Sequence, residues 1–307
     1  MVIRSTKDET GLLVAPSKSV LITSILHGNL GRCENGDGKV TQLIATICDC
    51  GKSVIGVSDR MVSTGDMTLG FESPNRKAEK LTHKSAVLIA GTVHEPDLVR
   101  DARERVKGKD RIREIAEECA QLYLQLRLKR IEDEILKAMI GIRSFSEYHQ
   151  KQQGLHESVV FDTNDKIKSY QLGLDLILIG LDDTAHISLV TNPGIWRSYD
   201  NLGYCTLGMG ERHADNVFAW YKYSIATPLK EALYIAFEAK KKSEMAGGIG
   251  PTTDALIIRN QGIEIVNERT LARLLEIYNE REHGAERHKI DGKITDLNLE
   301  THKLEDS

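Results

Sequence analysis

Short apolar runs bounded by turn residues alternate with stretches whose apolar residues recur at helical spacing. The runs predict strands over 41–47, 53–58, 86–90, 174–180, 185–190 and 195–199, and a closing hairpin over 253–259 and 262–266. The helical stretches predict helices over 97–106, from 110 to about 131, from 211 to 221, and over 229–242 and 271–278. Asp110 and the pair Thr227-Pro228 are the expected N-terminal caps of the second and fourth of these helices.

This order of strands, two helices, strands, two helices and strands predicts an α+β protein. Each sheet must bury one face on the other sheet and cover its second face with helices, which gives a four-layer αββα sandwich. We expect one such domain over 41–280, preceded by an N-terminal extension or propeptide over 1–40. Residues 142–170 lose the apolar pattern and predict an exposed insertion or partner-binding arm, and the charged segment 281–307 predicts a disordered tail.

Composition excludes several classes of protein. The 307 residues carry a net charge of -4, whereas nucleic-acid binding favours a basic face, so we expect no nucleic-acid partner. No apolar run approaches the roughly 18 residues that span a bilayer, and no membrane association is expected. Residues 1–9 lack the basic-then-apolar order of a signal peptide, which favours a cytoplasmic protein.

The cysteines do not suggest a disulfide framework or a metal site. Five cysteines at irregular spacing are most simply reduced thiols. Cys48-Asp49-Cys50 lacks the second Cys or His pair that a zinc site needs, and the ten histidines are scattered. We therefore expect no metal and no cofactor.

Four residues between 41 and 91 carry the candidate chemistry. Thr41, Asp59, Lys77 and Gly91 supply a hydroxyl, a carboxylate, an ammonium and a backbone N–H, each at the end of a predicted strand. These are the parts of a nucleophilic hydrolase site. Taken one at a time, each also has an ordinary structural explanation: a β-forming threonine, a turn aspartate, a surface lysine and a packing glycine.

The order and spacing of these segments resemble the proteasome β-type subunits and the related bacterial ring peptidase HslV. The matching segments are Thr41-Gln42-Leu43-Ile44-Ala45, Val57-Ser58-Asp59 through Gly65, Lys77-Ala78-Glu79-Lys80-Leu81 followed by Gly91, Leu174 to Gly180, His186 to Val190, Asn192-Pro193-Gly194, and Cys205 to Gly210 with Ala214. The resemblance implies the N-terminal-nucleophile (Ntn) hydrolase form of the αββα sandwich. It also implies a threonine-type endopeptidase that cleaves unfolded polypeptides or peptides inside a homo-oligomeric ring, with an ATP-dependent unfoldase as a partner.

The resemblance also implies a role for each site residue. Thr41 would be the nucleophile once residues 1–40 are removed, because its free α-amine then accepts the hydroxyl proton. Lys77 would tune that amine, Asp59 would orient Lys77, and the Gly91 N–H would bind the oxyanion. The pocket for the side chain before the cleaved bond would be lined by Val62, Ile89 and Val93, so we expect it to prefer small or medium apolar side chains.

Several positions depart from the family pattern and keep an alternative open. Lys39-Val40 precedes Thr41 where the family has a glycine, and Met209 stands where the family has a serine. Ser243 and Ala246 lie near the positions of a supporting aspartate and serine. The stretch from Thr41 to Asp59 is also longer than in the family, so Val40, which has no hydroxyl, is a second alignment for the nucleophile position. The alternative function is a catalytically silent ring subunit or scaffold, and hydrolysis of a small amide is a third.

Overall fold

Two antiparallel sheets form the centre of the protein in the computed structural model, which describes residues 41–63, 70–91, 96–282, 284 and 287–303. The described residues belong to one compact unit, and the predicted extension over 1–40 lies outside them. The first sheet has the order β10-β1-β2-β11-β12-β13: β1 (Gln42–Cys48), β2 (Ser53–Asp59), β10 (Tyr204–Gly208), β11 (Thr253–Arg259), β12 (Gly262–Val266) and β13 (Thr301–Lys303).

The second sheet is built from consecutive strands joined in the order β5-β6-β7-β8-β9. Its strands are β5 (Ala78–Thr82), β6 (Ser85–Gly91), β7 (Leu174–Leu181), β8 (Ala185–Thr191) and β9 (Ile195–Ser198). A separate two-stranded ribbon pairs β3 (Met61–Ser63) with β4 (Gly70–Glu72). The predicted strands are therefore present within a residue or two of their expected ends, whereas the hydrophobic pattern did not predict β3, β4, β5, β10 or β13.

Helices follow the strands in three groups along the chain. The first group is α1 (Pro96–Val106) and α2 (Ile112–Ile131). The second group comprises the π-helical turn η2 (Glu132–Lys137), α3 (Ala138–Ile140), α4 (Phe145–Lys151), the short turn η3 (Gln152–Gly154) and α5 (Glu157–Ser169). The third group is α6 (Glu211–Tyr221), α7 (Leu229–Ser243), α8 (Glu268–Glu282) and α9 (Arg287–Thr295); a short 3-10 turn, η1 (Asp49–Gly51), joins β1 to β2.

The two large sheets bury one face against each other. Successive residues of a strand point to opposite faces, so Leu43 and Ala45 of β1 face the second sheet, where Leu88 and Ile179 share their buried cluster. The sheets approach each other closely at Gly56, where a Cβ would come within 2.9 Å of the Ile179 side chain. Successive residues of β1 thus contribute in turn to the interface between the sheets and to the interface with the helices.

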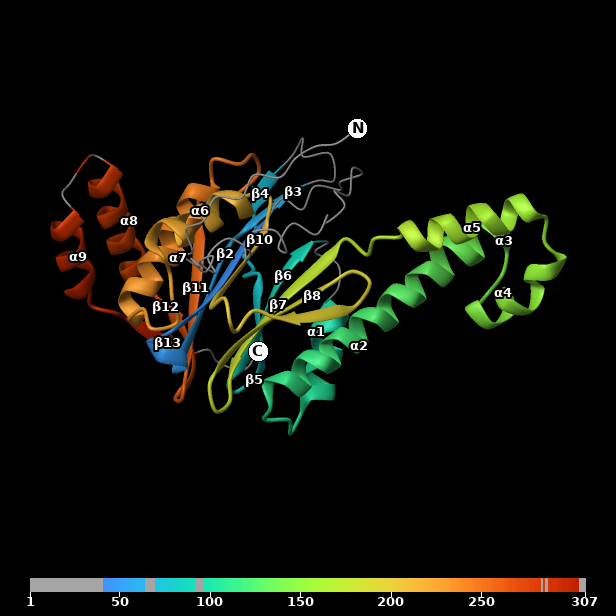
Figure 1. The fold of residues 1–307 in the computed structure, drawn as a ribbon, viewed down its shortest axis with the longest axis horizontal. Helices are drawn as coiled ribbons and strands as arrows, with labels where there is room; N and C mark the ends of the chain where they lie inside the picture. Colours follow the sequence, from blue (N-terminus) through green and yellow to red (C-terminus); the bar gives the residue numbers. More distant parts are fainter. Residues whose placement is uncertain (1–40, 64–69, 92–95, 283, 285–286, 304–307) are drawn as a thin grey trace, which may run out of the picture. The chain divides into compact units, whose positions relative to one another are not determined.

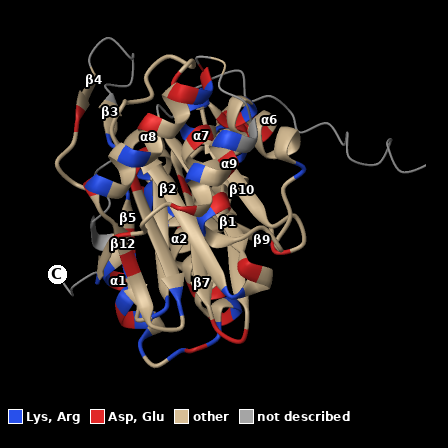
Figure 2. Ribbon diagram, turned by 90° about the vertical axis from the view of Figure 1, so that its left-hand side faces the viewer, with Lys and Arg blue, Asp and Glu red and all other residues tan. Residues whose placement is uncertain are grey.

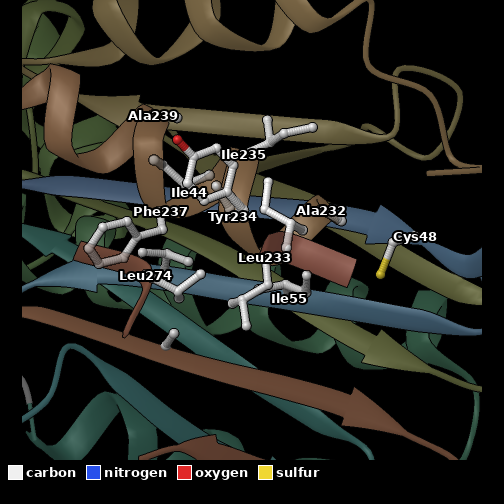
Figure 3. Packing of buried hydrophobic residues seen from close by; sticks show 14 of the residues in the cluster. Ile44, Cys48, Ile55, Ala232, Leu233, Tyr234, Ile235, Phe237, Ala239 and Leu274 are labelled. Atoms are coloured by element: carbon white, nitrogen blue, oxygen red, sulfur yellow. The ribbon is translucent and has the colours of Figure 1, made fainter. Parts of the chain in front are cut away.

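Helices cover the outer face of each sheet. Ile44 and Ile55 point away from the second sheet and pack with side chains of α6, α7, α8 and α9, as Figure 3 shows for Tyr234, Phe237 and other residues of α7. On the second sheet, Leu176 and Leu178 pack with α1 and α2. Figure 2 shows charged residues along the helices and the connecting turns, while the central strands carry few. Within the described residues, no helix has both the length and the apolar character that crossing a bilayer requires.

The prediction of a disordered tail over 281–307 is wrong for most of this segment. Helix α9 places Ile290 and Ile294 in the core beneath α7, and Leu297 is buried after it. Strand β13 then pairs with β12, with Thr301 opposite Val266. Ile290 and Ile294 are the two apolar anchors of α9, and two isoleucines among many polar residues are too few to indicate a helix from the sequence.

The insertion expected over 142–170 is helical and has a core of its own. Leu136, Ile142 and Tyr148 form a buried cluster that is separate from the other three clusters. Figure 1 shows α3, α4 and α5 gathered at the far end of α2. At the base of this arm, the Arg127 guanidinium donates to the carbonyls of Ile167 (3.0 Å) and Tyr170 (3.2 Å). The arm is therefore an ordered subdomain of residues 132–170.

Both expected helix caps are also wrong. The residue at the N-cap of α2 is Arg111 rather than Asp110, and the N–H of Ile112 instead donates to Asp182 Oδ2 at 3.0 Å. Pro228, not Thr227, precedes α7, and the N–H of Leu229 donates to Asp49 Oδ1 at 3.0 Å. In both helices a carboxylate distant in the sequence accepts a hydrogen bond from the N–H of the first helical residue. Capping rules based on neighbouring residues cannot predict such a contact.

Candidate active site

The first sheet brings Thr41 and Asp59 to the same end of two neighbouring strands. Thr41 immediately precedes β1, and Asp59 is the last residue of β2. The two strands are antiparallel, with Leu43 opposite Ser58, so the start of one lies beside the end of the other. Lys77 immediately precedes β5 of the second sheet and reaches this end from there.

Lys77 links the hydroxyl to the carboxylate. Its ammonium donates hydrogen bonds to Thr41 Oγ1 at 2.9 Å and to Asp59 Oδ1 at 2.8 Å. Thr41 is 4% exposed, Asp59 is fully buried and the Lys77 side chain is 13% exposed. Three of the four candidate residues therefore meet in one buried cluster. Val40, the second alignment for the nucleophile position, lies outside the described residues, so the choice of nucleophile stays a prediction.

Asp59 accepts hydrogen bonds on both of its oxygens. Oδ1 accepts from the Gln42 N–H (2.9 Å) as well as from Lys77, and Oδ2 accepts from the N–H groups of Met61 (3.1 Å) and Gly250 (3.4 Å). Four donors around a carboxylate fix its orientation. Asp59 is thus held as a rigid acceptor for the Lys77 ammonium.

The environment of Lys77 perturbs its proton affinity in two opposing ways. Burial lowers the pKa of Lys77 below its usual value, while the charge of Asp59, its hydrogen bond to Lys77 and the charge of Glu72 oppose that change. An ammonium with a lowered pKa is a better hydrogen-bond donor and a readier source of a proton than a solvated lysine. Such perturbed groups are typical of catalytic sites, although structural ion pairs also produce them.

Gly91 is the last residue of β6 and lies at the same end of the sheet as Lys77, which precedes the antiparallel strand β5. The Lys77 carbonyl accepts a hydrogen bond from the Ile89 N–H at 2.8 Å, two positions before Gly91. Gly91 has a φ of +123°, and a Cβ there would lie 2.0 Å from the Gly173 carbonyl oxygen. This close approach is by itself sufficient to require glycine. The oxyanion role of its N–H stays a prediction.

The predicted pocket residues lie on different elements. Val62 is in β3, opposite Phe71 of β4. Ile89 is in β6 and packs partly buried against the cluster that α1 and α2 form with the second sheet. Val93 lies outside the described residues. Their joint role as a pocket lining therefore stays a prediction.

The segment Gly208-Met209-Gly210 lies beside the backbone of Thr41. The Met209 N–H donates to the Thr41 carbonyl at 3.2 Å, and Gly208 has a φ of +121°. A Cβ at Gly208 would lie 1.8 Å from the backbone carbonyl oxygen of Thr41, so only glycine fits. Ser243 Oγ donates to the Gly210 carbonyl at 3.1 Å, which links this segment to α7.

Three residues that belong to the site escaped the sequence analysis. Gln42 donates its backbone N–H to Asp59, Gly250 does the same from the loop after α7, and Lys240 of α7 binds the Gly250 carbonyl. Gln42 was considered only as a strand residue, and Lys240 is one of three consecutive lysines whose spacing gives no sign that one of them is buried.

The described part of the chain contains no group of three His, Cys, Asp or Glu side chains placed to hold a metal ion. Cys48, Cys50, Cys119 and Cys205 are free, and Cys33 lies outside the described residues. The site as described thus consists of a hydroxyl, an ammonium, a carboxylate and backbone groups.

A scan against protein-family models gives no match to this chain, and a search of the curated proteins also gives none.

Proposed function

We propose that this protein is a threonine-type peptidase that uses Thr41 as an N-terminal nucleophile. The observation that carries the proposal is the Lys77 ammonium, which lies between the Thr41 hydroxyl and the Asp59 carboxylate at 2.9 and 2.8 Å. A hydroxyl that accepts a hydrogen bond from a buried ammonium is stabilised as it develops negative charge, which is what a nucleophilic oxygen requires.

The proposed reaction begins after the peptide bond before Thr41 is cleaved. The freed α-amine accepts the hydroxyl proton as Thr41 Oγ1 attacks the substrate carbonyl, and the protonated amine then donates a proton to the leaving amine. The Lys77 charge favours the neutral form of the α-amine, and the Gly91 N–H stabilises the oxyanion. Water then hydrolyses the acyl ester and regenerates the threonine.

We propose that the fold is the four-layer αββα sandwich of the Ntn hydrolases. The support is the three successive buried clusters: one between α6–α9 and the first sheet, one between the two sheets, and one between the second sheet and α1–α2. The proposed location is the cytoplasm, which accords with the free thiols of the described cysteines.

Assembly into a homo-oligomeric ring, with a peptide or unfolded polypeptide as substrate and an ATP-dependent unfoldase as partner, belongs to the same proposal. Trp220 supports a contact surface on α6, because its side chain is 70% exposed and aromatic residues are enriched in interfaces. Tyr221 and Tyr223 instead pack against the core, where they serve the fold.

A catalytically silent subunit that keeps the fold is the second candidate. The specific observation in its favour is Met209, which stands beside the Thr41 carbonyl where the family carries a serine hydroxyl. A methionine donates no side-chain hydrogen bond, so this position lacks a polar group that the active members use.

A chain produced to begin at Thr41 distinguishes the two candidates. We expect it to hydrolyse fluorogenic peptides, with faster cleavage after Leu or Ala than after Arg or Glu if Val62, Ile89 and Val93 line the pocket. The full-length chain should be inactive, since an amide nitrogen cannot accept the hydroxyl proton.

Thr41→Ala in the same shortened chain is the matched control, because it removes one hydroxyl and leaves the hydrogen-bonded backbone unchanged. It should fold and hydrolyse nothing. If the unsubstituted chain folds, assembles and cleaves no member of a broad peptide panel, the peptidase proposal fails and the silent subunit replaces it.

A further inference from the structure

Lys240 is a second buried lysine next to the candidate site. It lies on α7 with no exposed surface, and its ammonium donates to the Gly250 carbonyl at 2.6 Å and to Glu244 Oε1 at 2.5 Å. Burying an ammonium is unfavourable unless partners compensate for the lost water. A methionine or leucine would fill this space without that cost, so the charge calls for an explanation beyond packing.

Its contact leads directly to Asp59. The carbonyl of Gly250 binds Lys240, and the N–H of the same residue donates to Asp59 Oδ2 at 3.4 Å. The loop at Gly250 is also closely confined, since a Cβ there would lie 2.3 Å from Glu72 Oε1 and 3.1 Å from Met61 Cβ. One residue thus joins two charged groups, on α7 and on β2.

We propose that Lys240 is a positioning residue that holds the Gly250 peptide against Asp59 and adds positive potential to the Thr41–Lys77–Asp59 cluster. This role rests on the proposed peptidase function for its effect on catalysis, whereas its structural part does not. The hydrogen bonds lead from Lys240 to Gly250, from Gly250 to Asp59, and from Asp59 through Lys77 to the Thr41 hydroxyl.

The charges around this cluster come from four elements. Asp59 is on β2, Glu72 is on β4, Lys77 precedes β5, and Lys240, Lys241 and Glu244 lie on or next to α7. Lys240 is itself paired with Glu244, so its positive charge is partly neutralised and its electrostatic effect on Asp59 and Lys77 is reduced. Removing it leaves Glu244 bound to Lys241 and makes the surroundings of Asp59 and Lys77 more negative.

Lys241 provides a matched control for any substitution at Lys240. It is the next residue, its ammonium binds the same Glu244 at 2.7 Å, and its side chain is 15% exposed. Both lysines bind Glu244; Lys240 in addition donates to the Gly250 carbonyl, whereas Lys241 makes a second hydrogen bond to Glu244. Lys240→Met and Lys241→Met therefore separate the effect on Gly250 from the general loss of a lysine.

The first test needs no catalysis. In the unsubstituted full-length protein the Gly250 amide should exchange slowly with deuterium, and in Lys240→Met it should exchange at least tenfold faster, while Lys241→Met leaves it unchanged. In protein labelled with ¹³C-lysine, the Lys77 resonance, identified by its absence in Lys77→Arg, should titrate at higher pH in Lys240→Met, because a nearby positive charge is lost.

The second test uses the chain that begins at Thr41. In Lys240→Met we expect kcat/KM to fall by roughly 10- to 100-fold and the acid limb of its pH profile to move to higher pH. The limb moves because a less positive site favours protonation of the α-amine. A purely structural defect would lower the rate equally at all pH values, and Lys241→Met should show neither effect.

The outcomes separate this inference from the peptidase proposal. If the unsubstituted shortened chain is inactive but Gly250 exchange and Lys77 titration change as stated, the peptidase proposal fails and the positioning contact stands. If Gly250 already exchanges rapidly in the unsubstituted protein, or neither observable changes in folded Lys240→Met, the inference is overturned. Should Lys240→Met not fold, Lys240→Gln keeps an N–H donor without the charge, and an unchanged Lys77 titration in that variant equally overturns it.

Discussion

Asp59→Asn should strongly destabilise the protein, because no orientation of an asparagine amide satisfies the four donors around this side chain. If the NH₂ group replaces Oδ1, it faces the Gln42 N–H and the Lys77 ammonium. If it replaces Oδ2, it faces the N–H groups of Met61 and Gly250. In either orientation Lys77, 13% exposed, also loses its counter-charge.

The expected loss in the free energy of unfolding is about 3–5 kcal/mol, the cost of breaking a buried ion pair by removing one partner. Lys77 can respond by losing its proton, which from a reference pKa of about 10.4 costs at most about 4.6 kcal/mol at pH 7. The two figures agree in scale. With a denaturant dependence of about 3 kcal/mol per molar urea, the unfolding midpoint should fall by more than about 1 M.

Urea unfolding of the full-length protein at neutral pH measures this loss, and Asp254→Asn is the control. Asp254 is on the neighbouring strand β11, where it binds Arg60 through two hydrogen bonds of 2.7 and 2.6 Å. Arg60 is 27% exposed, so water can replace part of this interaction and the loss should be smaller. A loss below about 1 kcal/mol for Asp59→Asn would refute the reasoning, because the charged pair would then contribute no more than a surface one.

Two further predictions concern regions away from the site. His186 binds Asp200 and Asp182, and chiefly its hydrogen bond to Asp200 raises its pKa; the stabilisation is therefore complete below the unfolded pKa and is lost as pH rises through the folded one. His186→Gln should accordingly cost more stability in urea unfolding at about pH 5 than at about pH 9, and equal losses would contradict this assignment. Leu136→Ala should cost about 2–4 kcal/mol within the arm, with faster hydrogen exchange over 132–170 and unchanged exchange at Ile177; uniform acceleration would show that the arm shares the main core.

The sequence predicted the parts of the fold whose signal is local. The apolar runs of β1, β2, β6 and β7 were recognisable because their residues are buried on both faces. Strand β5 was missed, since all its residues except Leu81 are only partly buried and two of them are charged. The carboxylates of Asp182 and Asp49 accept hydrogen bonds at the starts of α2 and α7. These contacts could not be predicted from the sequence, because the tertiary fold brings the residues together.

The candidate site was predictable in its residue types and not in its supports. Thr41, Asp59 and Lys77 could be selected because strand ends and family spacing point to them, and the structure joins them by hydrogen bonds. Lys240 and Gly250 could not, because a lysine within a basic run and a glycine within a loop have ordinary surface explanations. Only the folded chain shows that Gly250 donates to the Asp59 carboxylate while its carbonyl binds Lys240.

The arm has a consequence for how the chain tolerates change in length. Arg127 fastens the two sides of its base, and Leu136, Ile142 and Tyr148 lie beyond that point in a cluster that shares no member with the sheets. Insertions, deletions or whole replacements between the base and η3 therefore alter a self-contained module, while a cut on the sheet side of Arg127 would expose the packing of α2 on β7 and β8. Homologous chains should accordingly vary most in length within 132–170, and a foreign domain joined there would leave Thr41 and its partners in register.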